Sequence, residues 1–194
     1  AARFVRERPA LDRNPWLYSM VLNPPAVFGR AGHACGVSLD VPVQKQLEMI
    51  AQGLKGVKYL GLLYDPRYNA EVFMKAVAES AIYDLKIVPL KVSSKKDIPG
   101  VLKQNWENID ALWLIPDQTV ISESIVEYII KDALFKKIPV IGYNRFFYES
   151  GAALAFIFNY EEIGRQTGRM AANLLKENDC EKETPVFHVW LNLR

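Results

Sequence analysis

The chain has 194 residues, of which 50% are hydrophobic, so it is long enough to bury one good core or two small ones. Its 24 lysine and arginine residues nearly balance its 22 aspartate and glutamate residues, which argues against a partner selected by overall charge, such as nucleic acid or an anionic membrane. The longest apolar runs, such as Ala152 to Phe158, are too short to span a bilayer, and the opening Ala1-Ala2-Arg3 shows no signal peptide, although a cleaved leader would leave none.

Short apolar runs alternate with amphipathic segments along almost the whole chain. Strands are predicted at 15–21, 57–63, 87–92, 109–115, 138–142, 151–158 and 185–193. Helices are predicted at 41–54, 69–85, within 93–106, from 122–127 onward and at 160–176, with Asp40, Asn69 and Asn159 as N-caps. The glycine-containing stretch that ends at Gly36 is predicted to be a loop. Such alternation of strand and helix predicts a parallel sheet in an α/β fold.

The run Ile109–Ile115 is the most informative stretch of the chain. It is apolar, short and closed by Pro116, which is typical of a strand that is buried on both faces. Asp117 and Thr119 follow directly, where ligands bind in open α/β sheets, at the carboxyl ends of the strands. An equally good interpretation is that Asp117 only helps the chain turn into the next helix.

Four of the predicted strands end in polar or aromatic pairs. The pairs are Ser19 and Asn23, Tyr64 and Asp65, Asp117 and Thr119, and Tyr143 and Asn144. A parallel sheet gathers its carboxyl strand ends at one edge, so these side chains are expected to converge on a cleft. Carboxylate, amide, hydroxyl and aromatic groups suit a small polar or zwitterionic ligand.

Catalytic chemistry finds little support in this sequence. The only histidines are His33 and His188, which makes a histidine-based metal site or a Ser-His-Asp triad improbable. No phosphate loop, dinucleotide fingerprint or nucleophile elbow is present. Asp65 and Asp117 could in principle hold a metal, but turn formation explains Asp65 better. We therefore predict no enzyme, no metal and no cofactor. From spacing alone, Cys35 and Cys180 could be free or bridged.

Several motifs, taken in order, resemble a bacterial family of ABC-transporter substrate-binding proteins. These are Val37-Ser38-Leu39 with Gln46-Leu47, Leu60-Gly61-Leu62-Leu63-Tyr64-Asp65-Pro66, Val92-Ser93-Ser94 with Asp97-Ile98-Pro99, Ala111-Leu112-Trp113-Leu114-Ile115-Pro116-Asp117, Lys137-Ile138-Pro139-Val140-Ile141-Gly142, Gly151-Ala152, and Tyr160 with Gly164-Arg165-Gln166. Each motif alone is weak, but the ordered set is specific and covers nearly the whole chain from Pro15 onward.

The resemblance implies the type 1 periplasmic-binding fold, with two parallel-sheet α/β lobes that close on a ligand. By resemblance, residues 1–36 and 151–180 form one lobe, and residues 37–150 and 181–194 form the other. Some relatives are thought to carry aromatic amino acids. The resemblance therefore implies a solute-binding component of an ABC importer that binds a small molecule, an amino acid and preferably an aromatic one, in the cleft between the lobes. It implies a transporter permease as partner and a periplasmic or extracellular, membrane-associated location.

Three further expectations follow from the resemblance. Relatives carry a strand–helix–strand–helix segment before the position of Ala1, so the first lobe is expected to be incomplete and its uncovered faces to favour self-association. Cys35 and Cys180 each fall near a crossover between lobes, which predicts a disulfide. The alternative function is a ligand-sensing domain of a signalling receptor or regulator, because the same lobes serve both roles.

Overall fold

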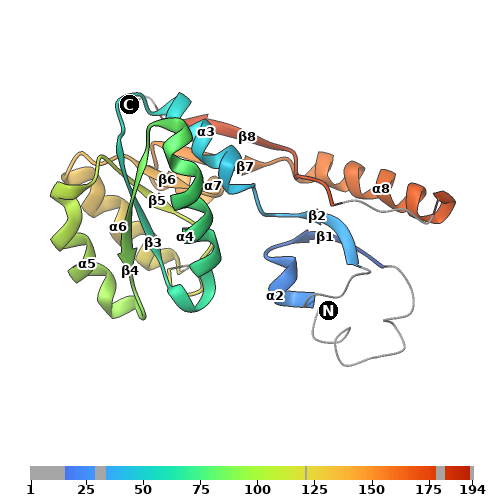
Figure 1. The fold of residues 1–194 in the computed structure, drawn as a ribbon, viewed down its shortest axis with the longest axis horizontal. Coiled ribbons are helices and arrows are strands. Elements are labelled where there is room, and N and C mark those ends of the chain that lie inside the picture. Colours follow the sequence, from blue (N-terminus) through green and yellow to red (C-terminus); the bar gives the residue numbers. More distant parts are fainter. Residues whose placement is uncertain (1–15, 29–33, 121, 178–181, 193–194) are drawn as a thin grey trace. The chain divides into compact units, whose positions relative to one another are not determined.

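The computed structural model describes residues 16–28, 34–120, 122–177 and 182–192. By its contacts the chain divides into two compact units, each described here by itself (Figure 1). The first unit comprises Ala1–Pro42 and Phe158–His188, and the second comprises Val43–Ile157 and Val189–Arg194. The family resemblance implies crossings between lobes at 36/37, 150/151 and 180/181, whereas the divisions in the structure fall at 42/43, 157/158 and 188/189.

A six-stranded sheet forms the centre of the second unit. Its strand order is β4-β3-β5-β6-β7-β8, and the pairs from β4 to β7 are parallel. The strands are β3 (Tyr59–Tyr64), β4 (Lys86–Lys91), β5 (Ala111–Leu114), β6 (Val140–Gly142), β7 (Leu154–Phe158) and β8 (Phe187–Leu191). All four residues of β5 are buried, which agrees with a central strand that is covered on both faces.

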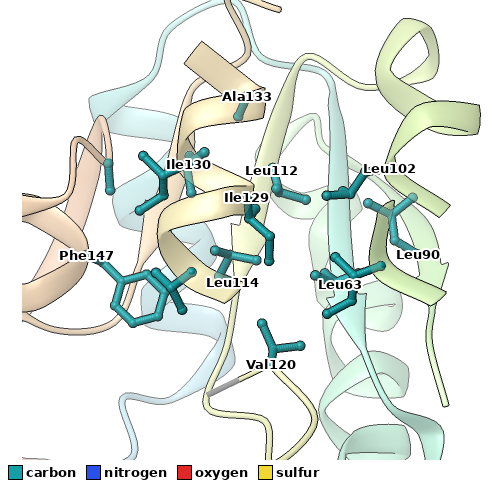
Figure 2. Close-up of a cluster of buried hydrophobic side chains, with 14 of the residues drawn as sticks. Leu63, Leu90, Leu102, Leu112, Leu114, Val120, Ile129, Ile130, Ala133 and Phe147 are labelled. Atoms are coloured by element: carbon teal, nitrogen blue, oxygen red, sulfur yellow. The ribbon is translucent and has the colours of Figure 1, made fainter. Parts of the chain in front are cut away.

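Helices pack on both faces of this sheet. They are α3 (Val43–Gly53), α4 (Pro66–Ser80), α5 (Ile98–Asn105), α6 (Glu123–Phe135) and α7 (Arg145–Glu149), with short 3-10 turns η2 (Ala81–Tyr83), η3 (Lys95–Asp97) and η4 (Trp106–Asn108). On one face, Leu112 and Leu114 of β5 and Leu63 of β3 belong to the same buried cluster as Ile129 of α6 and Leu102 of α5 (Figure 2). Trp113 points to the other face, where its indole N–H donates to Gln46 of α3. This alternation along β5 is the period of two expected of a strand.

The described part of the first unit is built on a short parallel pair of strands. β1 (Trp16–Val21) pairs with β2 (Ala34–Ser38), and α2 (Pro24–Phe28) lies between them in the chain. α8 (Tyr160–Glu177) places Ile163 and Met170 against Val37 of β2. Gly36 has a φ of 149°, and a Cβ there would lie 2.0 Å from the carbonyl oxygen of Tyr18, so only glycine fits this close approach.

Several local predictions were wrong. α2, β2 and α7 were not predicted, because Pro24-Pro25 was interpreted as a stop and the segment through Gly36 as a loop. The N-cap of α4 is Asp65 rather than Asn69, which sits inside the helix at a kink. Asp40 lies three residues before α3 begins at Val43, and its carboxylate accepts the backbone N–H of Asn23 at 2.9 Å. Asn159 does accept from the N–H of Glu162, as its capping spacing predicts.

Two predictions concern cysteines and membrane spans. Cys35 is buried and takes part in a disulfide. Cys180 lies outside the described residues, so the pairing of Cys35 with Cys180 stays a prediction. Among the helices within the described ranges, none is long and apolar enough to cross a membrane.

Candidate functional site

The carboxyl ends of β3, β5 and β6 lie side by side at one edge of the second unit's sheet. Asp65 directly follows β3, Asp117 follows β5 after Ile115 and Pro116, and Tyr143 follows β6. The topology therefore brings together three of the four polar pairs that the sequence predicts to converge. We call this place the carboxyl edge.

Asp117 links two loops at the carboxyl edge, and it is only 2% exposed. Its Oδ2 accepts the backbone N–H of Asp65 at 2.8 Å and the side-chain amide of Asn69 at 2.7 Å. Its Oδ1 accepts the backbone N–H of Thr119 at 2.8 Å. The carboxylate thus ties the loop after β3 to the loop after β5, and three of its roughly four lone-pair positions are filled.

Asp65 is buried beside it and forms an ion pair with Arg67. Arg67 donates from its backbone N–H and from Nε to Oδ1 of Asp65, both at 3.0 Å, and the hydroxyl of Thr119 donates to Oδ2 at 2.8 Å. These hydrogen bonds and the guanidinium charge of Arg67 hold the pKa of Asp65 well below its usual range. Arg67 also donates from Nη2 to the carbonyl of Ser93, which follows β4.

Tyr143 and Asn144 complete the carboxyl edge, and both are half-buried. Burial, and secondarily the charge of Asp117, raises the pKa of Tyr143 to about 12, so its hydroxyl keeps its proton at neutral pH. The ring of Tyr143 packs on Phe147 with centroids 4.5 Å apart. Asn144 caps α7 by accepting the N–H of Phe147 at 3.2 Å.

Tyr64 occupies a different environment from Tyr143. Its side chain is 2% exposed, and its ring stacks on Phe73 of α4 with centroids 4.7 Å apart and planes 5° apart. Burial raises the pKa of its hydroxyl. Its ring is therefore part of the packing between β3 and α4.

Ser19 and Asn23 belong to the first unit, where both are exposed. The Ser19 hydroxyl forms a hydrogen bond of 2.8 Å with the hydroxyl of Thr167 on α8. Asn23 has a left-handed backbone with φ of 49°, and its N–H donates to Asp40. Burial raises the pKa of Asp40.

Two members of the carboxyl edge, Arg67 and Asn69, were not predicted as site residues. The signal was present in the sequence, because an aspartate before a proline is a strong N-cap pattern with proline at the first helical position. Asp65 as N-cap puts Arg67 and Asn69 in the first turn of α4, next to the strand end. The prediction of Asn69 as the cap hid this relation.

The chemistry of the carboxyl edge favours binding of a cation or ammonium group. Two buried carboxylates, Asp65 and Asp117, share one guanidinium, that of Arg67, so the cluster keeps an excess of one negative charge. A phenol that stays protonated lies beside them. Within the described ranges, no group of three or more histidine, cysteine, aspartate or glutamate residues could hold a metal ion.

Comparison with protein families identifies the relatives of this chain. Residues 29–189 match the model of the family described as ABC transporter substrate binding protein. A curated relative named tyrosine-binding protein, from Clostridioides difficile (strain R20291), is 22% identical over 147 residues, which is 75% of this chain. The chain spans only 42% of that relative's length.

Two solved structures show the same fold. One is the ligand-free, open structure of a substrate binding protein with adhesive properties from Clostridium difficile, with a TM-score of 0.73 and 26% identity over 92% of this chain and 64% of that one. The other is an ABC domain from Streptococcus pneumonia in complex with L-Trp, with a TM-score of 0.70 and 20% identity over 99% of this chain and 69% of that one. These similarities agree with the type 1 periplasmic-binding fold that the sequence motifs imply.

Proposed function

This chain belongs to the family of ABC transporter substrate-binding proteins, and from that premise we propose that it serves an ABC importer as the component that binds a zwitterionic amino acid, preferably an aromatic one. Binding in this proposal is non-covalent and leaves the ligand unchanged. The permease of the importer is the partner that the family implies.

Family membership carries this proposal, and the names of two relatives support its choice of ligand. One relative is named for tyrosine binding, and a structure with the same fold was solved with L-Trp. The carboxyl edge supplies matching chemistry, since it combines excess negative charge for an ammonium group with the half-buried ring of Tyr143 for an aromatic body.

Within the carboxyl edge we assign different tasks to different residues. Tyr143 and Asn144 are only half-buried, so they are the groups we expect to touch the ligand directly. Asp117 is proposed to attract the ammonium by charge and through its remaining lone pair. Asp65 and Thr119 are proposed to hold Asp117 and its loop in place. The predicted ligand roles of Ser19, Asn23 and Tyr64 stay predictions.

Calorimetry with a set of related compounds tests the ligand class. We expect L-Trp, L-Tyr or L-Phe to bind, and we expect binding to weaken about tenfold or more for indole-3-propionate, which lacks the ammonium group. Tyr143→Ala should weaken binding, while Tyr128→Ala, on an exposed tyrosine of α6, is the matched control. Equal binding of the amino acid and its deaminated analogue would contradict an acidic site for ammonium.

An extracytoplasmic, membrane-associated location is part of the same proposal. The disulfide at Cys35 supports it, because disulfides persist in oxidising compartments. Mass spectrometry of molecules released from purified protein, together with recovery of the unchanged ligand, tests binding against catalysis. Self-association also remains a proposal, and light scattering tests it.

A further inference from the structure

The amino ends of the strands in the second unit, opposite the carboxyl edge, carry several lysines. What we call the basic edge consists of five exposed lysines: Lys55, Lys58, Lys86, Lys136 and Lys137. Lys58 and Lys86 lie at the starts of β3 and β4, Lys55 follows α3, and Lys136 and Lys137 lie between α6 and β6. Only β5 separates β3 from β6. Since neighbouring strands lie about 4.8 Å apart, these lysines share one edge.

Acidic groups at this edge do not cancel the lysines. Asp84 and Glu107 are exposed. Asp110 is engaged locally, because its Oδ2 accepts the backbone N–H groups of Lys58 and Tyr59 at 2.8 Å, and Asp132 of α6 accepts the indole N–H of Trp106 at 3.0 Å. Five lysines therefore face four acids, and two of these acids, Asp110 and Asp132, are engaged in hydrogen bonds within the fold. The near neutrality of the whole chain conceals this local excess of positive charge. A surface hollow of about 290 Å³ also opens here, lined by Ala51, Leu54, Lys55, Gly56, Val57, Lys58, Tyr83 and Asp84.

Two apolar side chains project beside the lysines at the end of α6. Phe135 is 88% exposed and Leu134 is 57% exposed. Such exposure is unusual for a phenylalanine in an ordered helix. The lysines after α6 have an ordinary explanation in the negative end of the helix dipole, but the dipole does not explain Phe135.

The backbone fixes this tip rigidly and at some cost. The N–H of Lys137 donates to the carbonyl of Leu134, and the N–H of Ile138 donates to that of Ala133, which is a Schellman motif. Lys137 is the left-handed residue of this motif, with φ of 59°, where glycine is favoured.

We propose that the basic edge, together with Leu134 and Phe135, docks on an anionic lipid surface. Charge complementarity selects the lipid, because lysines near a membrane surface are attracted to anionic headgroups. Leu134 and Phe135 favour a membrane over a protein partner. Two protruding side chains at the end of a helix are too small an area for a stable protein interface, but they can insert into a lipid interface. The hollow beside Lys55 and Lys58 gives a headgroup a place to enter. This proposal is independent of the ligand at the carboxyl edge.

Vesicle co-sedimentation tests the proposal. We expect the protein to bind vesicles of phosphatidylcholine with phosphatidylglycerol and not those of phosphatidylcholine alone, and to be released at high salt. Each lysine near the surface contributes about fivefold to vesicle affinity, so Lys136→Glu/Lys137→Glu should weaken vesicle binding at least about 25-fold. Phe135→Ser should weaken it about tenfold. The matched control is Lys95→Glu/Lys96→Glu, an exposed lysine pair in η3 near the carboxyl edge, which should bind as the parent does.

A glycine at position 137 separates docking from structure. Lys137→Gly should raise the melting temperature, because glycine suits the left-handed backbone, and yet weaken vesicle binding about fivefold. Higher stability with unchanged vesicle binding would overturn the proposal. The proposal would also be overturned if the parent did not bind anionic vesicles, or if Lys95→Glu/Lys96→Glu weakened vesicle binding as much as Lys136→Glu/Lys137→Glu does. A dimer in light scattering that Phe135→Ser dissociates would overturn it too, because the exposed end of α6 would then contact a second copy of the chain.

Discussion

Asp117 illustrates how one side chain serves both interpretations that its sequence context allows. Its three N–H donors come from Asp65, Asn69 and Thr119, so it fixes two loops as a turn residue does. It also brings a buried negative charge to the edge where the proposed ligand binds. The sequence predicts the placement of Asp117 at a strand end from the short apolar run 109–115 and the proline that closes it. The donors could not be predicted, because they depend on β3 lying next to β5.

We expect Asp117→Asn to lower the free energy of unfolding by about 1–3 kcal/mol. An amide has one acceptor oxygen, so whichever way it is oriented, its NH₂ group faces at least one of the three N–H donors. Urea denaturation measures the change, with Asp84→Asn at an exposed left-handed position as the control that should change little. Unchanged stability together with weaker ligand binding would show that Asp117 acts only on the ligand.

Arg67 should control how stability responds to acid. The pKa of Asp65 is depressed in the folded protein, whereas the pKa of an aspartate in the unfolded chain is about 3.9. As pH falls below about 4, the unfolded state takes up a proton that the folded state does not, so the contribution of this carboxylate to stability is present above that pH and is lost as pH falls.

Arg67→Gln should therefore make the loss of stability between about pH 5 and pH 3 less steep, because the folded and unfolded pKa values of Asp65 move together. Urea unfolding at several pH values measures this slope. Arg145→Gln, which removes an exposed pair with Glu149, is the matched control. Equal slopes in all three proteins would mean that Arg67 does not set the ionisation of Asp65.

At the scale of elements, the sequence predicts those whose signal is local and strong. β3, β4 and β5 are apolar runs with clear stops, and they were predicted within two or three residues. β2 was missed because its strand character depends on Gly36 approaching the Tyr18 carbonyl, a contact between distant residues. α7 has only five residues, too few for a helical period to appear. α2 begins with two prolines, which end a strand and also suit the first turn of a helix.

α7 depends on a glycine in β6. A Cβ at Gly142 would lie 2.2 Å from Cβ of Phe147, which is a buried residue of α7. Gly142→Ala should therefore displace α7 and cost about 1–3 kcal/mol of stability. Because Tyr143 and Asn144 connect β6 to α7, ligand binding should weaken as well.

Gly100→Ala provides the comparison for Gly142→Ala. Gly100 lies in α5, and a Cβ there meets nothing within 4 Å. Alanine should raise stability by about 0.5–1 kcal/mol through helix propensity. Opposite signs in chemical denaturation are the expected result. Equal effects at both positions would show that the contact with Phe147 relaxes freely.

At the scale of the molecule, the chain passes between two units three times, and the last strand belongs to the sheet of the second. Alternation of strand and helix predicts an α/β fold but not which strands share a sheet. That assignment came from the resemblance to the family, which gave the strand at 151–158 to the first lobe. In the structure β7 instead pairs with β6 in the sheet of the second unit. Two of the divisions between the units, at 157/158 and 188/189, fall inside β7 and β8. An apolar run shows no break at such a point, so the sequence alone does not indicate these divisions.

The disulfide at Cys35 is the covalent feature with the widest consequence for the molecule. Its predicted partner, Cys180, is the only other cysteine in the chain. A bridge between them would close a loop long enough to contribute about 4–5 kcal/mol in the chain-entropy model. We expect no free thiol in the unreduced, unfolded protein, and a lower melting temperature after reduction. A monomer in denaturing, non-reducing electrophoresis distinguishes this bridge from one between the Cys35 residues of two chains. Two titrated thiols, or a dimer that reduction separates, would contradict the predicted pairing. A monomer without free thiols would mean that one disulfide links β2 to the chain beyond α8.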